Sequence, residues 1–123
     1  MFAEGNVDLI RSAILNELKS AQKKFGETHH SDHEGWSVLL EEYEEAKADL
    51  SIIKSKIDAL WEQTKENDVG TKDLSYLIKM SVLLSLESTQ IGAMACKWLY
   101  GKYKDMVSIT LNGEIVNERP ESE

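Results

Sequence analysis

Two short groups of oxygen-bearing side chains have the spacing needed to hold a metal ion. The first group is Glu41, Glu42 and Glu45, and the second is Glu87 with Gln90. Residues three or four apart on a helix share a face, so Glu42 and Glu45 point the same way, as do Glu87 and Gln90. Carboxylate and amide oxygens are hard ligands that suit Mg²⁺. If the two segments pack face to face, the pattern predicts a magnesium site between two helices.

A solvated acidic helix face is the simpler interpretation of the first glutamate run taken alone. Glu87 favours the metal site, because it interrupts the apolar run 82–86. A carboxylate on the inner face of a bundle costs on the order of several kcal/mol unless it is paired or bound to metal. The lysines of the same segment, Lys79 and Lys97, lie eight and ten residues away.

The segments that must position these side chains have helical periodicity. A first helix is predicted to begin at an Asn6 cap and to end at Gly26. A second, long helix is predicted from a cap at Ser31 or Asp32 to about Lys65, with a possible break near 51–55. Its apolar positions alternate by four and three, as in a coiled-coil seam: Leu39, Tyr43, Ala46, Leu50, Ile53, Ile57 and Leu60.

A third helix is predicted from a Thr71 or Asp73 cap to about Tyr103 or Lys104. Its segment 77–100 is apolar nearly all round, but the charged side chains within it favour the centre of a bundle over a membrane span. The residues predicted to face inward are Leu74, Leu77, Leu84, Ile91, Ala95 and Trp98.

The end of the chain carries a hairpin signal. Segments 108–111 and 114–116 flank Asn112-Gly113, which is the favoured dipeptide of a two-residue turn. The sequence therefore predicts an all-α bundle of three or four helices, two of them long, over residues 1–107. A short β-hairpin or extended acidic tail over residues 108–123 is expected to belong to the same domain.

Composition narrows the classes of partner. The net charge of −8 argues against binding to a nucleic-acid backbone or to an anionic membrane surface. It leaves phosphorylated small molecules open, because a bound divalent cation reverses the local sign. The first residues lack the basic and then apolar order of a signal peptide, so a cytoplasmic location is expected. The single cysteine, Cys96, is expected to be a small core residue.

Residues 33–45, with adjacent Glu41-Glu42 and with Glu45 three positions later, resemble the first motif of the MazG-like nucleoside triphosphate pyrophosphohydrolases. Residues 86–97 resemble the second motif of a phage and prophage branch of that family. The resemblance spans roughly 7–103. It implies an all-α homodimer or larger homo-oligomer that hydrolyses a nucleoside triphosphate to a monophosphate and pyrophosphate with Mg²⁺, or with Mn²⁺ as a substitute.

The resemblance also implies roles for single residues. Glu42, Glu45 and Glu87 correspond to metal ligands, and Glu41 to a further ligand or to a base for the attacking water. The family's second motif carries an aspartate where this chain has Gln90. An amide oxygen can bind Mg²⁺ but supplies no charge.

Three further side chains are candidates for substrate binding. Lys97 is placed to meet a phosphate, or else to extend along the surface toward water. Trp36, like Trp98, could stack on a base, although aromatic residues at helical spacing are more often core. His33 is a candidate phosphate contact beside the acidic helix.

Two other functions fit the same sequence. One is a non-catalytic helical interaction or assembly protein of phage type that keeps the fold without the activity. The other is a metal-binding module in which His29, His30 and His33 hold zinc, although no cysteine or other spaced ligand accompanies them.

Overall fold

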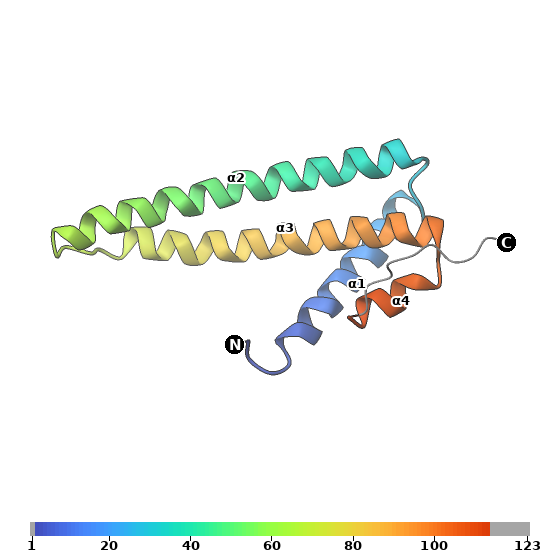
Figure 1. Ribbon diagram of the computed structural model, residues 1–123, viewed down its shortest axis with the longest axis horizontal. Helices are drawn as coiled ribbons and strands as arrows, with labels where there is room; N and C mark the ends of the chain where they lie inside the picture. Colours follow the sequence, from blue (N-terminus) through green and yellow to red (C-terminus); the bar gives the residue numbers. More distant parts are fainter. Residues whose placement is uncertain (1, 114–123) are drawn as a thin grey trace.

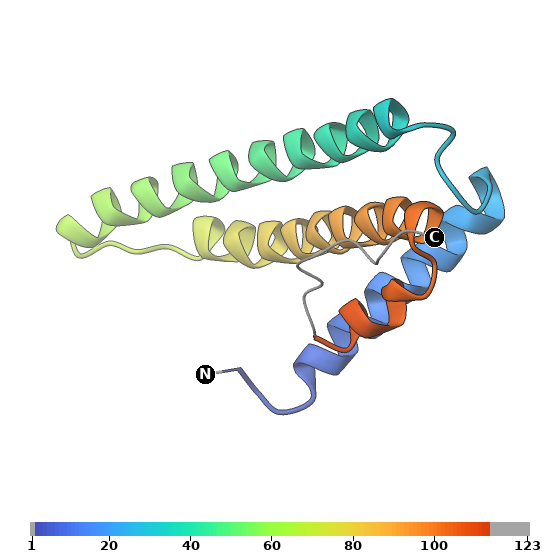
Figure 2. The same ribbon diagram turned by 45° about the vertical axis from the view of Figure 1, so that its right-hand side comes forward.

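The computed structural model describes residues 2–113, which form four helices (Figure 1). Helices α2 and α3 run antiparallel as a long hairpin, and α1 crosses α3 near the open end of that hairpin (Figures 1 and 2). The short helix α4 returns beside α1 and packs on α3. The predicted all-α bundle is confirmed. The helices are α1 (Asn6–Phe25), α2 (Asp32–Lys65), α3 (Lys72–Lys102) and α4 (Met106–Leu111).

None of the helices in this part of the chain combines the length and the apolar character needed to cross a membrane.

The start of α2 is fixed by side-chain caps. Ser31 is the N-cap, and its hydroxyl accepts a hydrogen bond from the Glu34 amide at 3.1 Å. The Glu34 carboxylate does not return to Ser31 as in a capping box; it accepts from the backbone amide of His30, at 3.1 Å. From there α2 continues through residues 51–55 without a break. The predicted Asn6 cap of α1 is wrong by one residue, because Gly5 is the cap, with φ of 88°.

The residues of α2 that face α3 differ from the predicted seam. Tyr43, Leu50 and Ile57 are exposed, whereas the partly buried row on this helix alternates apolar with polar side chains. The four-three alternation is compatible with two seams on α2. Both contain the same apolar positions, but one adds the exposed apolar residues and the other adds polar residues. The structure forms the seam with the polar residues. That seam is Leu39, Glu42, Ala46, Asp49, Ile53, Lys56, Leu60 and Gln63.

Polar pairing at the closed end of the hairpin favours this seam. The Gln63 side chain donates to Asp73 at 2.7 Å and accepts from the Gly70 amide at 3.2 Å. Lys56 Nζ lies 3.3 Å from Asp73 Oδ1. These partners, Gln63 first and then Lys56, lower the pKa of Asp73 below its usual value. Asp73 therefore links α2 to α3 and does not cap α3. The N-cap of α3 is Thr71, which makes no side-chain capping hydrogen bond.

The hydrophobic core lies at the opposite end, where α1, α3 and α4 meet. Its buried members are Leu18, Ala93, Met94, Cys96 and Val107. The closed half of the hairpin has only Met80 as a buried apolar residue within the described chain.

Two residues expected to face inward on α3 lie elsewhere. Leu74 and Ala95 are exposed. No third helix covers α3 at Leu74, and α1 passes to one side of Ala95. The single core therefore fixes the open end, and the rest of the hairpin is held by its own seam.

The hairpin predicted at the end of the chain is wrong in its first strand. Residues 108–111 belong to helix α4, which buries Val107 in the core. An isolated hairpin is marginal in water, so a helical turn that adds a core residue is the more stable arrangement. The predicted second strand, 114–116, lies outside the described residues.

Two glycines allow the helices to approach closely. A Cβ on Gly35 would lie 2.6 Å from the Trp98 ring, and one on Gly92 would lie 2.9 Å from Ile14 Cδ1. Gly35 therefore sets the spacing of α2 from α3, and Gly92 that of α1 from α3. The two obstacles differ, because the Trp98 indole is held by a hydrogen bond to Asp32 at 2.8 Å whereas a terminal methyl can rotate.

The substitution Gly35→Ala is expected to lower the free energy of unfolding by about 1 kcal/mol. Overpacking against the rigid indole outweighs the better helix propensity of alanine. Urea denaturation measures the change, with Gly92→Ala as the matched control. That control should stay within about 0.5 kcal/mol of wild type or gain stability. Equal losses in both variants would contradict the close approach at Trp98.

Candidate metal centre and adjoining cavity

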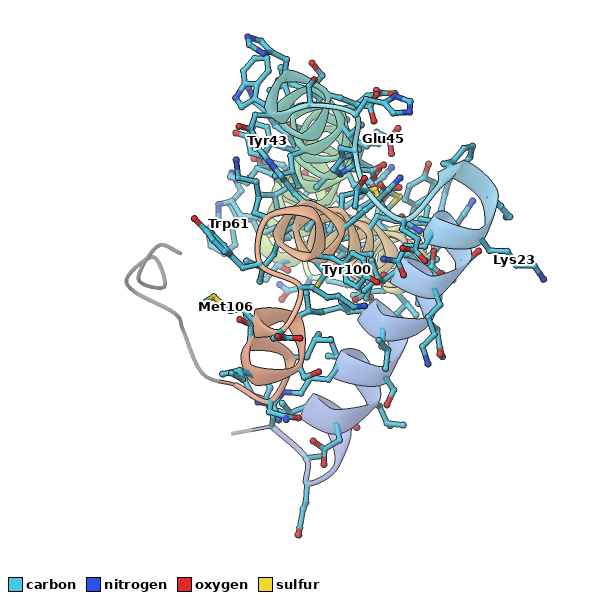
Figure 3. The ribbon with its side chains drawn as sticks, turned by 90° about the vertical axis from the view of Figure 1, so that its right-hand side faces the viewer. Lys23, Tyr43, Glu45, Trp61, Tyr100 and Met106 are labelled. Atoms are coloured by element: carbon cyan, nitrogen blue, oxygen red, sulfur yellow. The ribbon has the colours of Figure 1, made fainter. Side chains whose placement is uncertain are left out.

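Three glutamates from two helices meet beside the hairpin seam. Glu42 and Glu45 come from α2 and Glu87 from α3, and each offers one carboxylate oxygen within 4.8 Å of the others. Figure 3, which views the hairpin along its axis, shows Glu45 on the side of α2 toward α1. We call these three residues the glutamate triad. It joins the two motifs that the sequence analysis selected, which lie more than forty residues apart in the chain.

The donor set of the triad fits a hard divalent cation. Magnesium takes oxygen ligands at about 2.1 Å, so two oxygens on one ion lie at most about 4.2 Å apart. The observed spread of 4.8 Å needs only a small rotamer adjustment to reach that value. Mn²⁺ accepts the same ligands. Three carboxylates supply the charge of a divalent site and leave coordination positions for water and phosphate oxygens.

The triad is electrostatically unfavourable without a cation. Desolvation, the Glu45 carboxyl and then Asp49 and Glu42 raise the pKa of Glu87 to about 7. The pKa of Glu42 is also raised, first by desolvation and then by repulsion from Glu45 and Glu41. Among the described residues, no ion pair links the triad to a lysine or arginine. In the metal-free protein, a proton on Glu87 therefore reduces the repulsion within the triad, as a bound cation would.

A cavity of about 540 Å³ opens directly beside the triad, between α1, α2 and α3. Its apolar walls come from Phe25 on α1 and Met94 on α3, with smaller side chains between them. Its polar lining includes Glu41 and Glu42 on one side, and Gln90 and Lys97 on the other. The cavity thus brings one triad member, the predicted base and two predicted ligand-binding side chains to one place.

Lys97 is the unusual member of this lining. Its side chain is only 4% exposed, yet the structure shows no ion pair or hydrogen bond to it within residues 2–113. No buried side-chain nitrogen of residues 2–113 lacks a hydrogen-bond partner, so the unpaired Lys97 ammonium is not itself buried. Its stem lies in the wall and its charged end is open to the cavity, a position that favours an anion there.

Gln90 is turned toward α1 as well as toward the cavity. Its amide nitrogen donates a short hydrogen bond to the carboxylate of Glu17, on α1. The sequence analysis missed Glu17, which borders the apolar face of α1 next to the buried Leu18. Only the crossing of α1 over α3 places it beside the second motif.

The histidine loop also contributes to the cavity. The His29 side chain is 3% exposed and lies 3.6 Å from Glu34 and 3.4 Å from the Met94 carbonyl oxygen. His30 is exposed and pairs with the other oxygen of Glu34 at 3.0 Å. These contacts lower the pKa of Glu34, the backbone amide of His30 being the largest cause. Both histidines thus line the cavity.

The remaining predicted substrate contacts lie elsewhere. His33 and Trp36 line a separate surface hollow with Asp32 and Trp98, on another side of α2 from the cavity. The three histidines do not converge either: within the described chain, the glutamate triad is the single group of three potential ligands that gathers.

Comparison with protein-family models, with curated proteins and with solved structures gives no match to this chain. The MazG-like resemblance therefore remains a prediction, and the site is interpreted from its own chemistry.

The raised pKa of Glu87 makes a pH-dependent prediction for the metal-free protein. The native state holds this proton up to about pH 7, and the unfolded chain releases it near 4.5. The resulting stabilisation is complete below pH 4.5 and is lost as the pH rises through 7. Because Glu87→Gln cannot titrate, its stability relative to wild type should increase by about 1 kcal/mol between pH 5 and pH 8, a value reduced for solvent screening. Urea denaturation with a chelator measures this.

The exposed Glu44 provides the control, since it lies on α2 beside two members of the triad but outside the triad and the cavity lining. The substitution Glu44→Gln should leave the pH profile unchanged. Parallel profiles for wild type and Glu87→Gln would show that Glu87 does not carry the proton.

Proposed function

We propose that this protein is a Mg²⁺-dependent hydrolase that converts a nucleoside triphosphate to a monophosphate and pyrophosphate. The observation that carries the proposal is the glutamate triad, whose Glu42 lines a cavity that also has the charged side chain of Lys97 in its wall. A metal–polyphosphate complex requires carboxylates to bind the metal ion and a positively charged side chain to bind phosphate. This cavity offers both. The cavity volume of about 540 Å³ is in the range of small-molecule sites.

The chain's own residues divide the work in this proposal. Glu42, Glu45 and Glu87 hold Mg²⁺, with Gln90 adding an uncharged oxygen ligand. When bound, the ion neutralises phosphate charge and orients a water for attack on phosphorus. Lys97 binds phosphate oxygens from the opposite wall, which fixes the chain of phosphates across the cavity.

Glu41 is the proposed general base. It lines the cavity without belonging to the triad, so its carboxylate is free to accept a proton from the attacking water. The apolar wall formed by Phe25 and Met94 offers a surface for the base of the nucleotide. His33 and Trp36 have no part in this arrangement, because they lie at a different hollow.

The proposal predicts pyrophosphate release from one or more nucleoside triphosphates in the presence of Mg²⁺. Glu42→Gln and Glu87→Gln should each reduce the rate by at least about 100-fold, since each removes a charged ligand. A panel of ribo- and deoxyribonucleoside triphosphates, assayed for pyrophosphate, measures this. Glu44→Gln is the matched control and should retain wild-type activity.

The absence of release from well-folded protein with either Mg²⁺ or Mn²⁺ would refute the hydrolase. The assembly protein would then be the better interpretation.

A second structural feature favours self-association, whether the protein is an enzyme or an assembly component. Four apolar side chains on α2 recur at seven-residue intervals and are about half exposed or more. They are Trp36 at 59%, Tyr43 at 52%, Leu50 at 56% and Ile57 at 49%. In Figure 3, Tyr43 lies on the side of the hairpin opposite Glu45, and Trp61 lies there too. We call Trp36, Tyr43, Leu50 and Ile57 the outer α2 row.

A second copy of this chain is the proposed occupant of the outer α2 row. A seven-residue apolar repeat is the signature of a helix that pairs with another helix along its length. The same face on a second copy supplies a helix with the same repeat, as in a two-fold symmetric interface. Because the row lies away from the triad, pairing there leaves the cavity open.

The substitution Leu50→Glu is expected to weaken dimerisation by roughly 100-fold or more, because each dimer would bury two additional charges. Sedimentation over a range of concentrations measures the dimer dissociation constant. Ile78→Glu provides the control, since Ile78 is an apolar residue on α3 that is even more exposed than Leu50, at 69%. A monomeric wild type, or a loss of dimer with Ile78→Glu alone, would contradict this interface.

A further inference from the structure

We infer that Glu17 is a positioning residue for the metal centre, which it serves by orienting the Gln90 amide so that its oxygen is available as a ligand. The inference rests on the proposed function and assigns a role at that site to helix α1, which neither sequence motif includes. It also explains how a glutamine can stand where the resembling family has a charged ligand.

The argument begins with the hydrogen bond between the two side chains. An ionised carboxylate has only acceptors, so Glu17 fixes which end of the amide faces it. Gln90 must present its NH₂ group to Glu17, as the structure shows. The amide is planar, and its oxygen is therefore directed away from Glu17. Without this partner, either end of the amide could face the site.

The free end of Gln90 belongs to the proposed site. Gln90 lines the same cavity as Glu42 and lies three residues, about one helical turn, after Glu87. Lys97, a residue that is 4% exposed and has its unpaired charged end open to this cavity, independently favours an anionic ligand there. In the proposed site the amide oxygen is therefore the end of Gln90 that is available to the cation.

The Glu17 carboxylate also changes the strength of the ligand. A hydrogen bond from an amide NH₂ to a carboxylate polarises the amide and makes its oxygen a better donor to a cation. Position 90 itself carries no negative charge, and the Glu17 carboxylate on α1 supplies one through the hydrogen bond. Partners of this kind change metal affinity by about 10- to 100-fold when removed.

A purely structural role for the pair is the alternative. Helix α1 is already held on α3 by Leu18 in the core and by the close contact of Ile14 with Gly92. The Glu17–Gln90 bond is therefore not needed to dock α1. The two roles differ in one measurable respect: loss of a purely structural bond lowers the stability of the metal-free protein, whereas loss of the amide's orientation lowers metal affinity at unchanged metal-free stability.

The test is the affinity for Mn²⁺, measured by calorimetric titration without nucleotide, in the wild-type and Gln90→Asp backgrounds. In the wild-type background, Glu17→Ala should lower the affinity about tenfold, and Glu17→Gln should lower it less because a neutral acceptor remains. In the Gln90→Asp background, position 90 has no NH₂ group to orient. There, Glu17→Ala should cost no more than Glu44→Ala, the control for the loss of one negative charge.

Metal-free melting curves accompany each titration, so that a loss of fold is separated from a loss of affinity. If Glu17→Ala does not alter Mn²⁺ affinity in the wild-type background, or lowers it equally in both backgrounds, the positioning role is overturned. In that case, continued Mn²⁺ binding and pyrophosphate release by the wild type leave the proposed function standing. If the wild type itself binds no Mn²⁺, the proposed function fails and this inference fails with it.

Discussion

The structure depends on a helix–helix seam that carries polar side chains at every seventh position of α2. Glu42, Asp49, Lys56 and Gln63 occupy this row, between the apolar residues that pack on α3. At the closed end the polar row is satisfied, because Lys56 and Gln63 both pair with Asp73. Toward the open end it is acidic, and the raised pKa of Glu87 records the cost. One seam is thus stabilising at one end and strained at the other.

The strain is tolerable because the core lies beside it. Val38 and Leu39 of α2 pack against the core residues of α1, α3 and α4, so the acidic end of the seam cannot relax by separating α2 from α3. Rigid placement of mutually repelling carboxylates is how a protein prepares a cation site before the cation arrives. In this fold the hydrophobic core and the proposed metal centre are parts of one arrangement.

Helix α1 has two tasks in that arrangement. It completes the core through Leu18, and it forms a wall of the cavity through Phe25. It also brings Glu17 to Gln90, so that a residue outside both glutamate motifs contacts the site. The two motifs, on α2 and α3, describe this site incompletely. Helix α1 also encloses the cavity and orients one of its side chains.

The sequence by itself determined the helices and selected the three glutamates that gather between two of them. Capping signals and apolar periodicity located α2 and α3 within a few residues, and the rule of helical faces selected Glu42, Glu45 and Glu87. Such local rules cannot choose between two seams that share Leu39, Ala46, Ile53 and Leu60, and they placed Tyr43 inside and Glu42 at its border. The tertiary structure decided that choice, the burial of Lys97, the separation of Trp36 from the cavity and the arrival of Glu17. Each of these depends on which helix crosses which, and that is fixed by packing between residues far apart in the chain.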